Sequence, residues 1–350
     1  MVRDRQFITL SEARMPLFAG IDLGGTNIKV GIVDDCGRPL SWHKIPTDSP
    51  RGPEDGARRM AEAVAEAARQ AGLKPEQIAA VGLGSPGTMD IPAGMLLEPH
   101  NLPGWYHFPI RERVSHYTEL PVTFVNDANA AAYGEFWVGT GRDFHSMVLF
   151  TLGTGIGCGV IIGELLIEGE HSHGAECGHI IVDSSPNARV CGCGQPGHLE
   201  AYASATAVIK RAEEALAAGR ASLVRQQIAG GERLTPLLLA KAAEQNDALA
   251  LELIMDTARW LGIGAVDLAH TIDPDGIVLG GAMTFGGQES PLGRKFLEQI
   301  HHEFKQRAFP VLAETIKIGF ASLGGDAGYL GAAGIARAAL RRKTVSPTHE

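Results

Sequence analysis

The chain has 350 residues, of which 45% are hydrophobic and 20% charged, with a formal net charge of −9 at pH 7. This composition is typical of a soluble globular protein with room for two domains, and the acidic balance argues against general nucleic-acid binding. No apolar run approaches the roughly 20 residues that span a bilayer. Five cysteines, three of them clustered, favour a reduced chain in the cytoplasm with a candidate metal site over a disulfide framework.

A polar tail of residues 1–16, expected to be disordered, precedes a glycine-rich turn at residues 22–27. This turn, Asp-Leu-Gly-Gly-Thr-Asn, lies between two apolar runs, which predicts a hairpin of two strands. The same pattern returns at residues 151–157, Thr-Leu-Gly-Thr-Gly-Ile-Gly. A dinucleotide fingerprint or a P-loop would instead run from a strand into a helix.

Around these turns, the apolar periodicity changes between that of strands and that of helices. In the first half it predicts strand 39–45, helix 55–71 capped by Asp55, strand 78–83, helix 110–118, strand 121–125 and helix 128–137. In the second half it predicts helices 199–218, 234–244, 248–271, 292–306 and 327–341, with strands at 276–279 and 315–320. This order predicts a mixed α/β sheet with helices on both faces, repeated once, and a cleft between the halves where a ligand binds.

The two glycine-rich turns carry the first functional prediction. Glycine lets backbone N–H groups approach an anion without interference from Cβ, and the hydroxyls of Thr26 and Thr154 add donors. Either turn alone reads equally well as an ordinary hairpin. The pair, together with the carboxylate of Asp22, favours a duplicated fold that binds a polyphosphate.

The ordered set of motifs resembles the ROK family of sugar kinases, within the sugar kinase–Hsp70–actin superfold, over residues 18–340. The motifs that carry the resemblance are Asp22–Thr26, Asn126–Ala130, Leu152–Gly157, Gly174–His179, Cys191–Glu200 and Val278–Gly281. The resemblance implies two actin-like ATPase (RNase H-like) domains with mixed sheets flanked by helices and a cleft between them. The implied N-terminal domain covers 17–135 and is joined by helix 327–341, and a larger domain with a zinc-binding loop covers 136–326.

The same resemblance implies ATP-dependent phosphorylation of a hexose 6-hydroxyl with Mg²⁺, and a role for each matching residue. Asp127 is the implied general base, although local sequence alone favours capping of a helix by Asn126 and Asp127. The implied nucleotide-binding set is Asp22, Gly24, Gly25, Thr26, Asn27, Lys29, Thr154, Gly155, Gly280 and Gly281. For the last two glycines, a strand-to-helix turn is at least as good an interpretation. The implied sugar-binding set is Ser85, Gly87, Asn101, Asn126, Asp127, Glu176, His179 and Glu200.

A candidate zinc site follows from His179, Cys191 and Cys193, since structural zinc takes four ligands in a tetrahedron. The family usually has cysteine at the fourth place of its Cys-Gly-Cys-Gly-x-x-Gly-Cys-x-Glu motif, where this chain has His198. The resemblance therefore implies a Cys₂His₂ set, with Cys177 as an alternative ligand. From the spacing of the cysteines alone, a zinc site and unliganded cysteines in a glycine-rich loop are equally good interpretations.

Glucose is the expected sugar, giving glucose 6-phosphate for glycolysis. N-acetylglucosamine, N-acetylmannosamine, mannose, fructose and allose stay open, as do polyphosphate donors. A non-catalytic sugar-responsive regulator is the alternative from a different class; only about seventeen residues precede the first hairpin, too few for a helix-turn-helix. From the resemblance we expect a homodimer or homotetramer, with no nucleic-acid or membrane partner.

Overall fold

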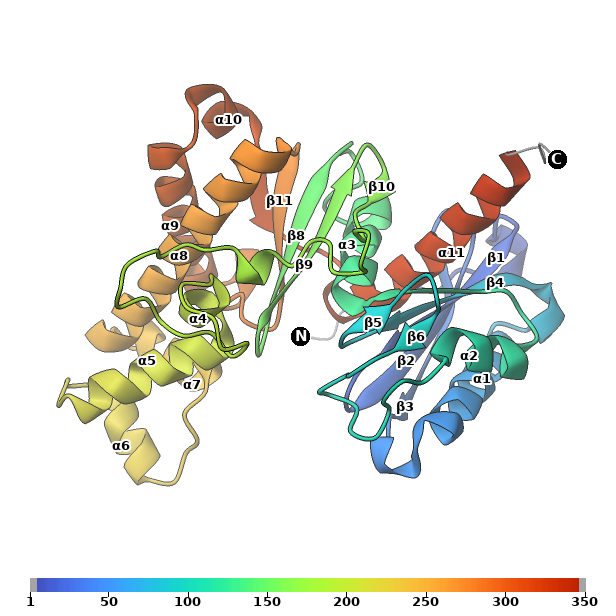
Figure 1. Cartoon of the computed structure of the whole chain (residues 1–350), viewed down its shortest axis with the longest axis horizontal. Coiled ribbons are helices and arrows are strands. Elements are labelled where there is room, and N and C mark those ends of the chain that lie inside the picture. Colours follow the sequence, from blue (N-terminus) through green and yellow to red (C-terminus); the bar gives the residue numbers. More distant parts are fainter. Residues whose placement is uncertain (1–4, 346–350) are drawn as a thin grey trace. The chain divides into compact units, whose positions relative to one another are not determined.

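The computed structural model describes residues 5–345 as two compact units (Figure 1). Unit 1 combines the chain up to Asp143 with Leu166–Gly174 and the chain from Leu323 onward, and unit 2 comprises Phe144–Leu165 and Ala175–Ser322. These units differ from the predicted domains in three places. The first boundary lies at Asp143 instead of residue 135, Leu166–Gly174 belongs with unit 1, and unit 1 resumes at Leu323 instead of residue 327.

Unit 1 contains a five-stranded sheet in the order β3-β2-β1-β4-β7, in which β1–β2 and β2–β3 are antiparallel and the other pairs are parallel. Its strands are β1 (Leu17–Leu23), β2 (Asn27–Val33), β3 (Pro39–Pro46), β4 (Ile78–Ser85) and β7 (Val122–Asn126), with a small hairpin of β5 (Met89–Asp90) and β6 (Met95–Leu96). Its helices are α1 (Pro53–Gln70), α2 (Ile110–Thr118), α3 (Asp127–Val138) and α11 (Ala327–Val345).

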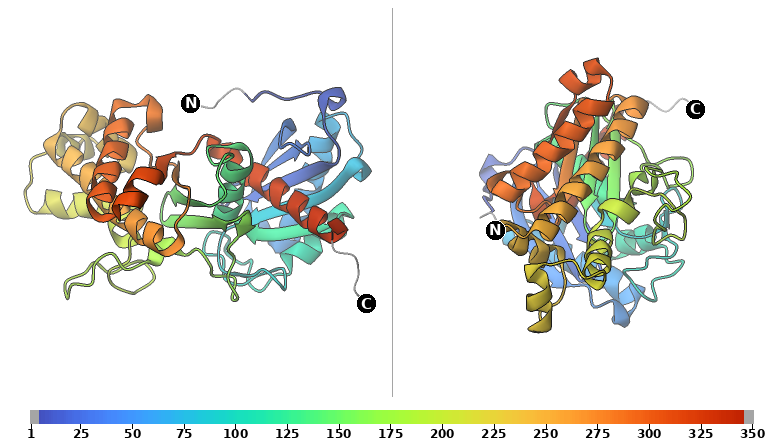
Figure 2. Two further views of the ribbon diagram at one scale, coloured as in Figure 1. Left: turned by 90° about the horizontal axis from the view of Figure 1, so that it is seen from above. Right: turned by 90° about the vertical axis from the view of Figure 1, so that its left-hand side faces the viewer.

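Unit 2 repeats this arrangement with a sheet in the order β10-β9-β8-β11-β12. Its strands are β8 (Met147–Leu152), β9 (Ile156–Ile162), β10 (Leu165–Leu166), β11 (Gly276–Gly281) and β12 (Lys317–Phe320). Its helices are α4 (Glu200–Ala203), α5 (Ala205–Ala217), α6 (Leu223–Ala229), α7 (Pro236–Glu244), α8 (Ala248–Ile272), α9 (Pro291–Arg307) and α10 (Pro310–Thr315). Helices α8 and α9 lie side by side (Figure 2). The predicted duplication of a mixed sheet flanked by helices is confirmed.

Short 3-10 helices complete the described elements. They are η1 (Leu10–Glu12), η2 (Ser49–Arg51), η3 (Pro75–Gln77), η4 (Cys177–His179), η5 (Gly287–Glu289) and η6 (Gly324–Asp326). Among residues 5–345, none of the helices combines the length and the apolar character needed to cross a membrane.

The two faces of the first sheet bury different helices because alternate residues of a strand point to opposite sides. Leu17, Ala19 and Ile21 pack in the cluster that holds α1 and α2, whereas Phe18 packs against Tyr329 of α11. Helix α11 lies along β1 and β4 (Figure 2). It approaches so closely that a Cβ on Gly20 of β1 would lie 1.8 Å from the backbone oxygen of Tyr329.

Three sequence-based predictions of elements need correction. Helix α1 begins at Pro53 after Gly52, so Asp55 lies in its first turn and does not cap it. The helix predicted at 199–218 is two helices, because Ser204 is extended and accepts a hydrogen bond from the N–H of Ala207 as the cap of α5. Residues 310–315 form α10, so the last strand starts at Lys317.

The tail prediction is also corrected from Arg5 onward, and residues 1–4 lie outside the described part of the chain. The Arg5 guanidinium binds both carboxylate oxygens of Asp326 and lies 3.7 Å from the ring centroid of Trp42. The N–H of Ile8 donates to the carbonyl of Pro39. These contacts join the tail to unit 1.

One buried carboxylate organises the end of α3. Glu135 is fully buried, and its side chain accepts hydrogen bonds from the N–H of Thr140 at 2.9 Å and of Leu323 at 2.7 Å. Thr140 and Leu323 flank the first and last points at which the chain passes between the units. A single residue of unit 1 thus ties together segments that are far apart in the sequence.

Candidate functional site

The first glycine-rich turn joins β1 to β2 as predicted. It is closed by a hydrogen bond from the N–H of Gly24 to the carbonyl of Asn27, and Thr47 braces it through a 2.6 Å bond to the carbonyl of Gly24. Gly25 and Thr26 are exposed. A Cβ on Gly25 would lie 2.9 Å from the backbone oxygen of Asn101, so glycine is needed for this loop to approach the hairpin.

Asp22 lies on β1 just before this turn, opposite Lys29 of β2. The Lys29 ammonium binds Asp22 Oδ2 at 2.9 Å and also donates to the carbonyl of Gly325. The side chain of Asp22 is 17% exposed and that of Lys29 is 30% exposed. The hairpin therefore presents exposed backbone groups next to a half-buried ion pair.

Asn126 and Asp127 lie where β7 ends and α3 begins, on the same edge of the sheet as Asp22, because β1, β4 and β7 are parallel. Asn126 is the N-cap of α3, accepting bonds from the N–H groups of Ala128 and Asn129. Asp127 is the first helical residue, and its Oδ1 accepts from the N–H of Ala128 at 2.8 Å. The positive end of the helix stabilises the anionic carboxylate there.

The neighbouring strand β4 contributes small residues at this edge. Ser85 is buried opposite Asn126, and a Cβ on Gly84 would lie 3.8 Å from the Cα of Asp127. Gly87 has φ +94°, and a Cβ there would lie 2.4 Å from the Cα of Pro99. The turn after β4 therefore requires glycine for its backbone conformation.

The second glycine-rich turn joins β8 to β9, as predicted, and is held by side chains from the helices that follow the loop. Glu200, the first residue of α4, accepts a hydrogen bond from the N–H of Ile156 at 2.9 Å. A Cβ on Gly155 would lie 2.3 Å from the Glu200 carboxylate. The Thr206 hydroxyl donates to the carbonyl of Thr154 at 2.8 Å. Thr154 itself is exposed.

Gly280 and Gly281 end β11 beside Thr151 and Leu152 of β8. Gly281 has φ +90°, and a Cβ there would lie 2.3 Å from the backbone oxygen of Leu152. Glycine at this position is therefore required by the backbone turn itself, which is the structural interpretation that the sequence left open.

The four predicted metal ligands gather in unit 2. One ligand atom from each of His179, Cys191, Cys193 and His198 lies within 4.8 Å of the others. The Nδ1 atoms of the two histidines are 3.2 Å apart, Cys193 Sγ is 3.3 Å from His198 Nδ1, and Cys191 Sγ is 3.8 Å from His179 Nδ1. Burial raises the pKa of the metal-free Cys191 thiol to about 11. Cys177 is outside this group; it is buried, and its thiol interacts with that of Cys158.

The metal ligands lie next to the predicted sugar-binding residues of this unit. Cys191 Sγ is 3.6 Å from Glu200 Oε1, and His179 belongs to both sets. Glu176 is exposed immediately before the 3-10 turn that carries His179. The structure thus brings the predicted residues together in two groups, one in each unit.

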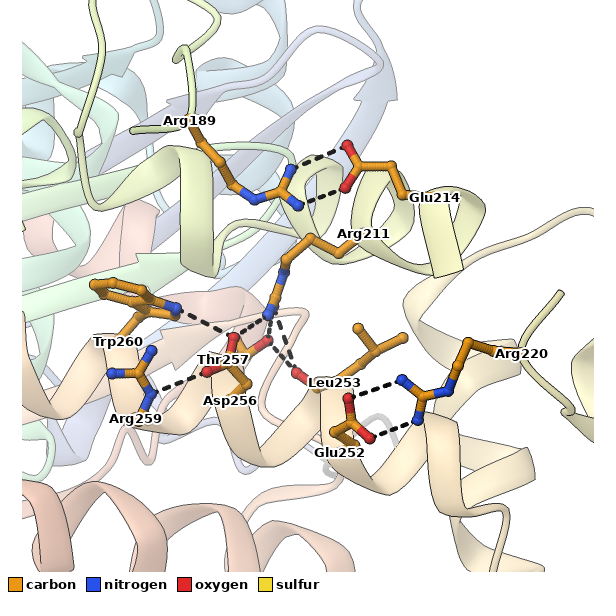
Figure 3. Close-up of polar contacts among 10 residues, drawn as sticks. All are labelled: Arg189, Arg211, Glu214, Arg220, Glu252, Leu253, Asp256, Thr257, Arg259 and Trp260. Atoms are coloured by element: carbon orange, nitrogen blue, oxygen red, sulfur yellow. Dashed lines mark hydrogen bonds and ion pairs between the residues drawn. The ribbon is translucent and has the colours of Figure 1, made fainter. Parts of the chain in front are cut away.

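Polar residues that the sequence did not single out support the second group. Arg211 of α5 is only 7% exposed and binds Asp256 Oδ2 and the Thr257 hydroxyl of α8, each at 2.5 Å (Figure 3). Burial lowers the pKa of Arg211. Figure 3 also shows Arg189, two residues before Cys191, paired with Glu214 of α5. No local pattern marks these residues, because their partners lie far away in the sequence.

The chain is similar in sequence and in structure to known sugar kinases. The glucokinase of Thermotoga maritima is 35% identical over 318 residues, covering 90% of this chain and 96% of that protein. The ROK hexokinase structure from Thermus thermophilus has a TM-score of 0.80 and 33% identity, covering 93% of this chain and 99% of that chain. The ROK family glucokinase of Streptomyces griseus, solved with glucose and AMPPNP, has a TM-score of 0.73 and 35% identity, covering 92% and 99%.

A family model supports the same relationship from the sequence side. The model described as ROK family matches residues 18–339, nearly the whole of the chain between the tail and the end of α11. The resemblance seen in the motifs is confirmed, as is the mixed α/β fold that it implied. The chain belongs to the ROK family.

Proposed function

We propose that this protein is a glucokinase, which transfers the γ-phosphoryl group of ATP to the 6-hydroxyl of glucose. The observation that carries the proposal is the position of Asp127, at the carboxyl end of a parallel strand and at the start of a helix, on the same sheet edge as the Asp22 hairpin. Rigid elements hold a carboxylate there, as base catalysis requires. Similarity to glucokinases over nine-tenths of the chain supports glucose as the acceptor.

In the proposed reaction, Asp127 accepts the proton of the 6-hydroxyl as its oxygen attacks the γ-phosphorus. The new O6–P bond forms while the bond from the γ-phosphorus to the bridging oxygen breaks, so the electron pair leaves with ADP. Backbone N–H groups of the glycine-rich turns would hold phosphate oxygens, and Asp22 would hold the magnesium of Mg-ATP through water. Mg²⁺ supplies positive charge that neutralises the developing charge on the phosphates.

The proposed sugar contacts are the groups that the family resemblance implies. In unit 1 these are the amide and carboxylate groups of Asn101, Asn126 and Asp127, and in unit 2 the side chains of Glu176, His179 and Glu200. A polyol needs several such partners, and one unpaired buried group costs a large factor in kcat/KM. Selection between glucose and other hexoses, or their N-acyl derivatives, depends on these side chains.

We include a structural zinc ion in the proposal. Zinc–nitrogen and zinc–sulfur bonds of a tetrahedral site place neighbouring ligand atoms about 3.3–3.6 Å apart. The observed separations of 3.2, 3.3 and 3.8 Å lie close to this spacing, and all four ligand atoms lie within 4.8 Å of one another, which supports His198, and not Cys177, as the fourth ligand. Four protein ligands leave no open position for an activated water, so the proposed role is to order the loop before Glu200.

Glucose 6-phosphate would enter glycolysis, and we extend the proposal to a cytoplasmic homodimer or homotetramer on family resemblance alone. The competing function is a non-catalytic sugar-responsive regulator. It would bind the same sugar without turning over ATP.

The test is an assay of ADP release with Mg-ATP across a panel of hexoses and N-acyl-hexosamines, with Asp127→Ala as the control. Strong turnover on glucose that the variant loses would support the proposed reaction. Preference for an N-acyl-hexosamine would support the proposed phosphoryl transfer and would show that glucose is the wrong acceptor. Sugar binding measured by calorimetry without any turnover would favour the regulator.

A further inference from the structure

Tyr202 lies inside unit 2 and contacts two separate points of the metal-ligand loop, here defined as residues 180–198. Its hydroxyl donates a hydrogen bond to Asp183 Oδ2 at 2.6 Å and accepts one from the N–H of Arg189 at 2.7 Å. Tyr202 is 4% exposed, and both bonds are partly buried. One phenol group thereby joins the outgoing and returning arms of the loop.

The remaining bonds of the loop are mostly internal. The N–H of Val182 donates to the carbonyl of Gly197 on the other arm, and the N–H of Gly197 donates to the carbonyl of Arg189. The Arg189–Glu214 ion pair reaches α5, but its side chains are 30% and 47% exposed, so solvent screens it. Among the bonds of the described residues, the Tyr202 hydroxyl joins both arms to α4, and the thiol of the buried Cys191 also lies 3.6 Å from Glu200 Oε1 of the same helix.

The Tyr202 ring rests on a rigid support. Its centroid is 4.2 Å from that of Trp260 on α8, whose Nε1 donates to Asp256 Oδ2. Asp256 in turn holds the buried Arg211 of α5, so the support spans two helices (Figure 3). Because Trp260 and Arg211 both donate to Asp256, the orientations open to these side chains are limited.

Tyr202 also shares its helical turn with a predicted sugar-binding residue. It lies in α4, whose first residue is Glu200, and Glu200 binds the N–H of Ile156 in the second glycine-rich turn. The loop arms held by Tyr202 lead directly to Cys191 and Cys193. The same side chain is therefore connected both to the metal ligands and to the start of α4.

We propose that Tyr202 is a positioning residue, which holds the metal-ligand loop against α4 and α8 and so places Glu200 and His179 for glucose. This inference rests on the proposed kinase function. The phenol itself has no contact with the reacting atoms in the proposed reaction, so its loss acts on the recognition of sugar. ATP recognition by the first glycine-rich turn, in unit 1, is expected to be independent of it.

The test is Tyr202→Phe, which keeps the ring on Trp260 and removes only the hydroxyl. Losing hydrogen bonds that involve a charged carboxylate is expected to raise KM for glucose about 10-fold. The kcat should stay within about twofold, and any rise in the KM for ATP should be smaller than the rise for glucose, since Glu200 also braces the second glycine-rich turn. Hydrogen exchange of the backbone amides in residues 183–190 should accelerate, and a chelating dye should remove zinc faster from the variant.

The matched control is Tyr117→Phe. Tyr117 of α2 also donates to a carboxylate, Glu54, at 2.5 Å, but in unit 1. This variant should leave KM for glucose and exchange in residues 183–190 unchanged. A second variant, Asp183→Asn, weakens the same bond from the other side and should shift the same two quantities in the same direction by less.

Normal KM for glucose together with normal exchange in Tyr202→Phe would overturn the inference. Faster exchange with unchanged KM would also overturn it, because the loop would then not govern sugar recognition. If the wild-type protein lacks kinase activity, the proposed function fails instead. In that case, exchange in residues 183–190 and glucose affinity by calorimetry still decide the role of Tyr202.

Discussion

The two sheets share one strand order but meet their helices in different ways. In unit 1, helix α11 approaches the strands backbone to backbone; a Cβ on Gly82 of β4 would lie 1.8 Å from the carbonyl oxygen of Ala332. In unit 2, the nearest atom to a Cβ on Gly280 of β11 is the Ala321 Cβ at 3.2 Å, and Gly319 of β12 has open space around it. The two sheets thus have the same order of strands. The distance at which α11 packs on the sheet of unit 1 depends on single glycines such as Gly82.

The two glycine-rich turns differ in a parallel way. The turn of unit 1 has its own charges, since Asp22 and Lys29 pair across the hairpin. The turn of unit 2 receives a carboxylate from outside, where Glu200 accepts the Ile156 N–H. The two turns thus have similar backbones and different charges, and we expect only the turn of unit 2 to be coupled to the metal-ligand loop through Glu200.

The largest expected effect comes from a comparison of two carboxylates, Asp127 in unit 1 and Glu200 in unit 2. Asp127→Asn should lower kcat about 10³-fold, since asparagine cannot accept the proton, while glucose affinity changes less than about threefold. Glu200→Gln should mainly raise KM for glucose, by about 10-fold, because it weakens the bond to Ile156. Steady-state kinetics and calorimetry on both variants check this. Near-normal kcat in Asp127→Asn would remove it as the base.

The second prediction concerns the spacing between layers. Gly82→Ala should destabilise the protein by about 3 kcal/mol or more, because the added methyl group forces the Ala332 backbone away from the sheet. Gly319→Ala is the matched control in unit 2, where a Cβ meets nothing within 4 Å, and should change stability by less than about 0.5 kcal/mol. Chemical denaturation measures both. Equal effects would refute the contrast between the units.

The third prediction concerns the metal ligands. Cys193→Ser should remove most of the bound zinc and raise KM for glucose about fivefold, because the loop before Glu200 loses an anchor. Cys36→Ser, in unit 1, should retain zinc and normal kinetics. Elemental analysis of the purified proteins measures the metal. Full activity in a verified zinc-free protein would contradict the proposed role of the metal.

The smallest expected effect concerns the charges of the first turn. Lys29→Met removes the partner of Asp22 and should raise KM for Mg-ATP about threefold, more strongly at low ionic strength. Lys44→Met is the control, because Lys44 is exposed on the neighbouring strand β3. Titration of both variants with Mg-ATP gives the comparison. If Lys29→Met changed the KM for glucose and left the KM for Mg-ATP unchanged, the prediction that Lys29 acts on Mg-ATP binding would be wrong.

Features that depend on nearby residues could be predicted from the sequence. The two hairpins and the helix start at Asn126–Asp127 follow from glycine, apolar runs and capping side chains within a few positions. Features that depend on distant partners could not be predicted. Arg5 is ordered by Asp326, and Tyr202 by Asp183 and Trp260, while Ser204 divides a helix that apolar periodicity alone leaves continuous.

Helix α11 has a consequence for the order in which the protein is made. Its residues follow all of unit 2 in the chain, yet they cover Phe18 and Ala80 on the first sheet. During synthesis, the strands of unit 1 therefore leave the ribosome with one face of their sheet uncovered. That face stays uncovered until α11 has been synthesised. A premature stop codon within α11 would leave unit 2 nearly intact and would prevent completion of the N-terminal unit.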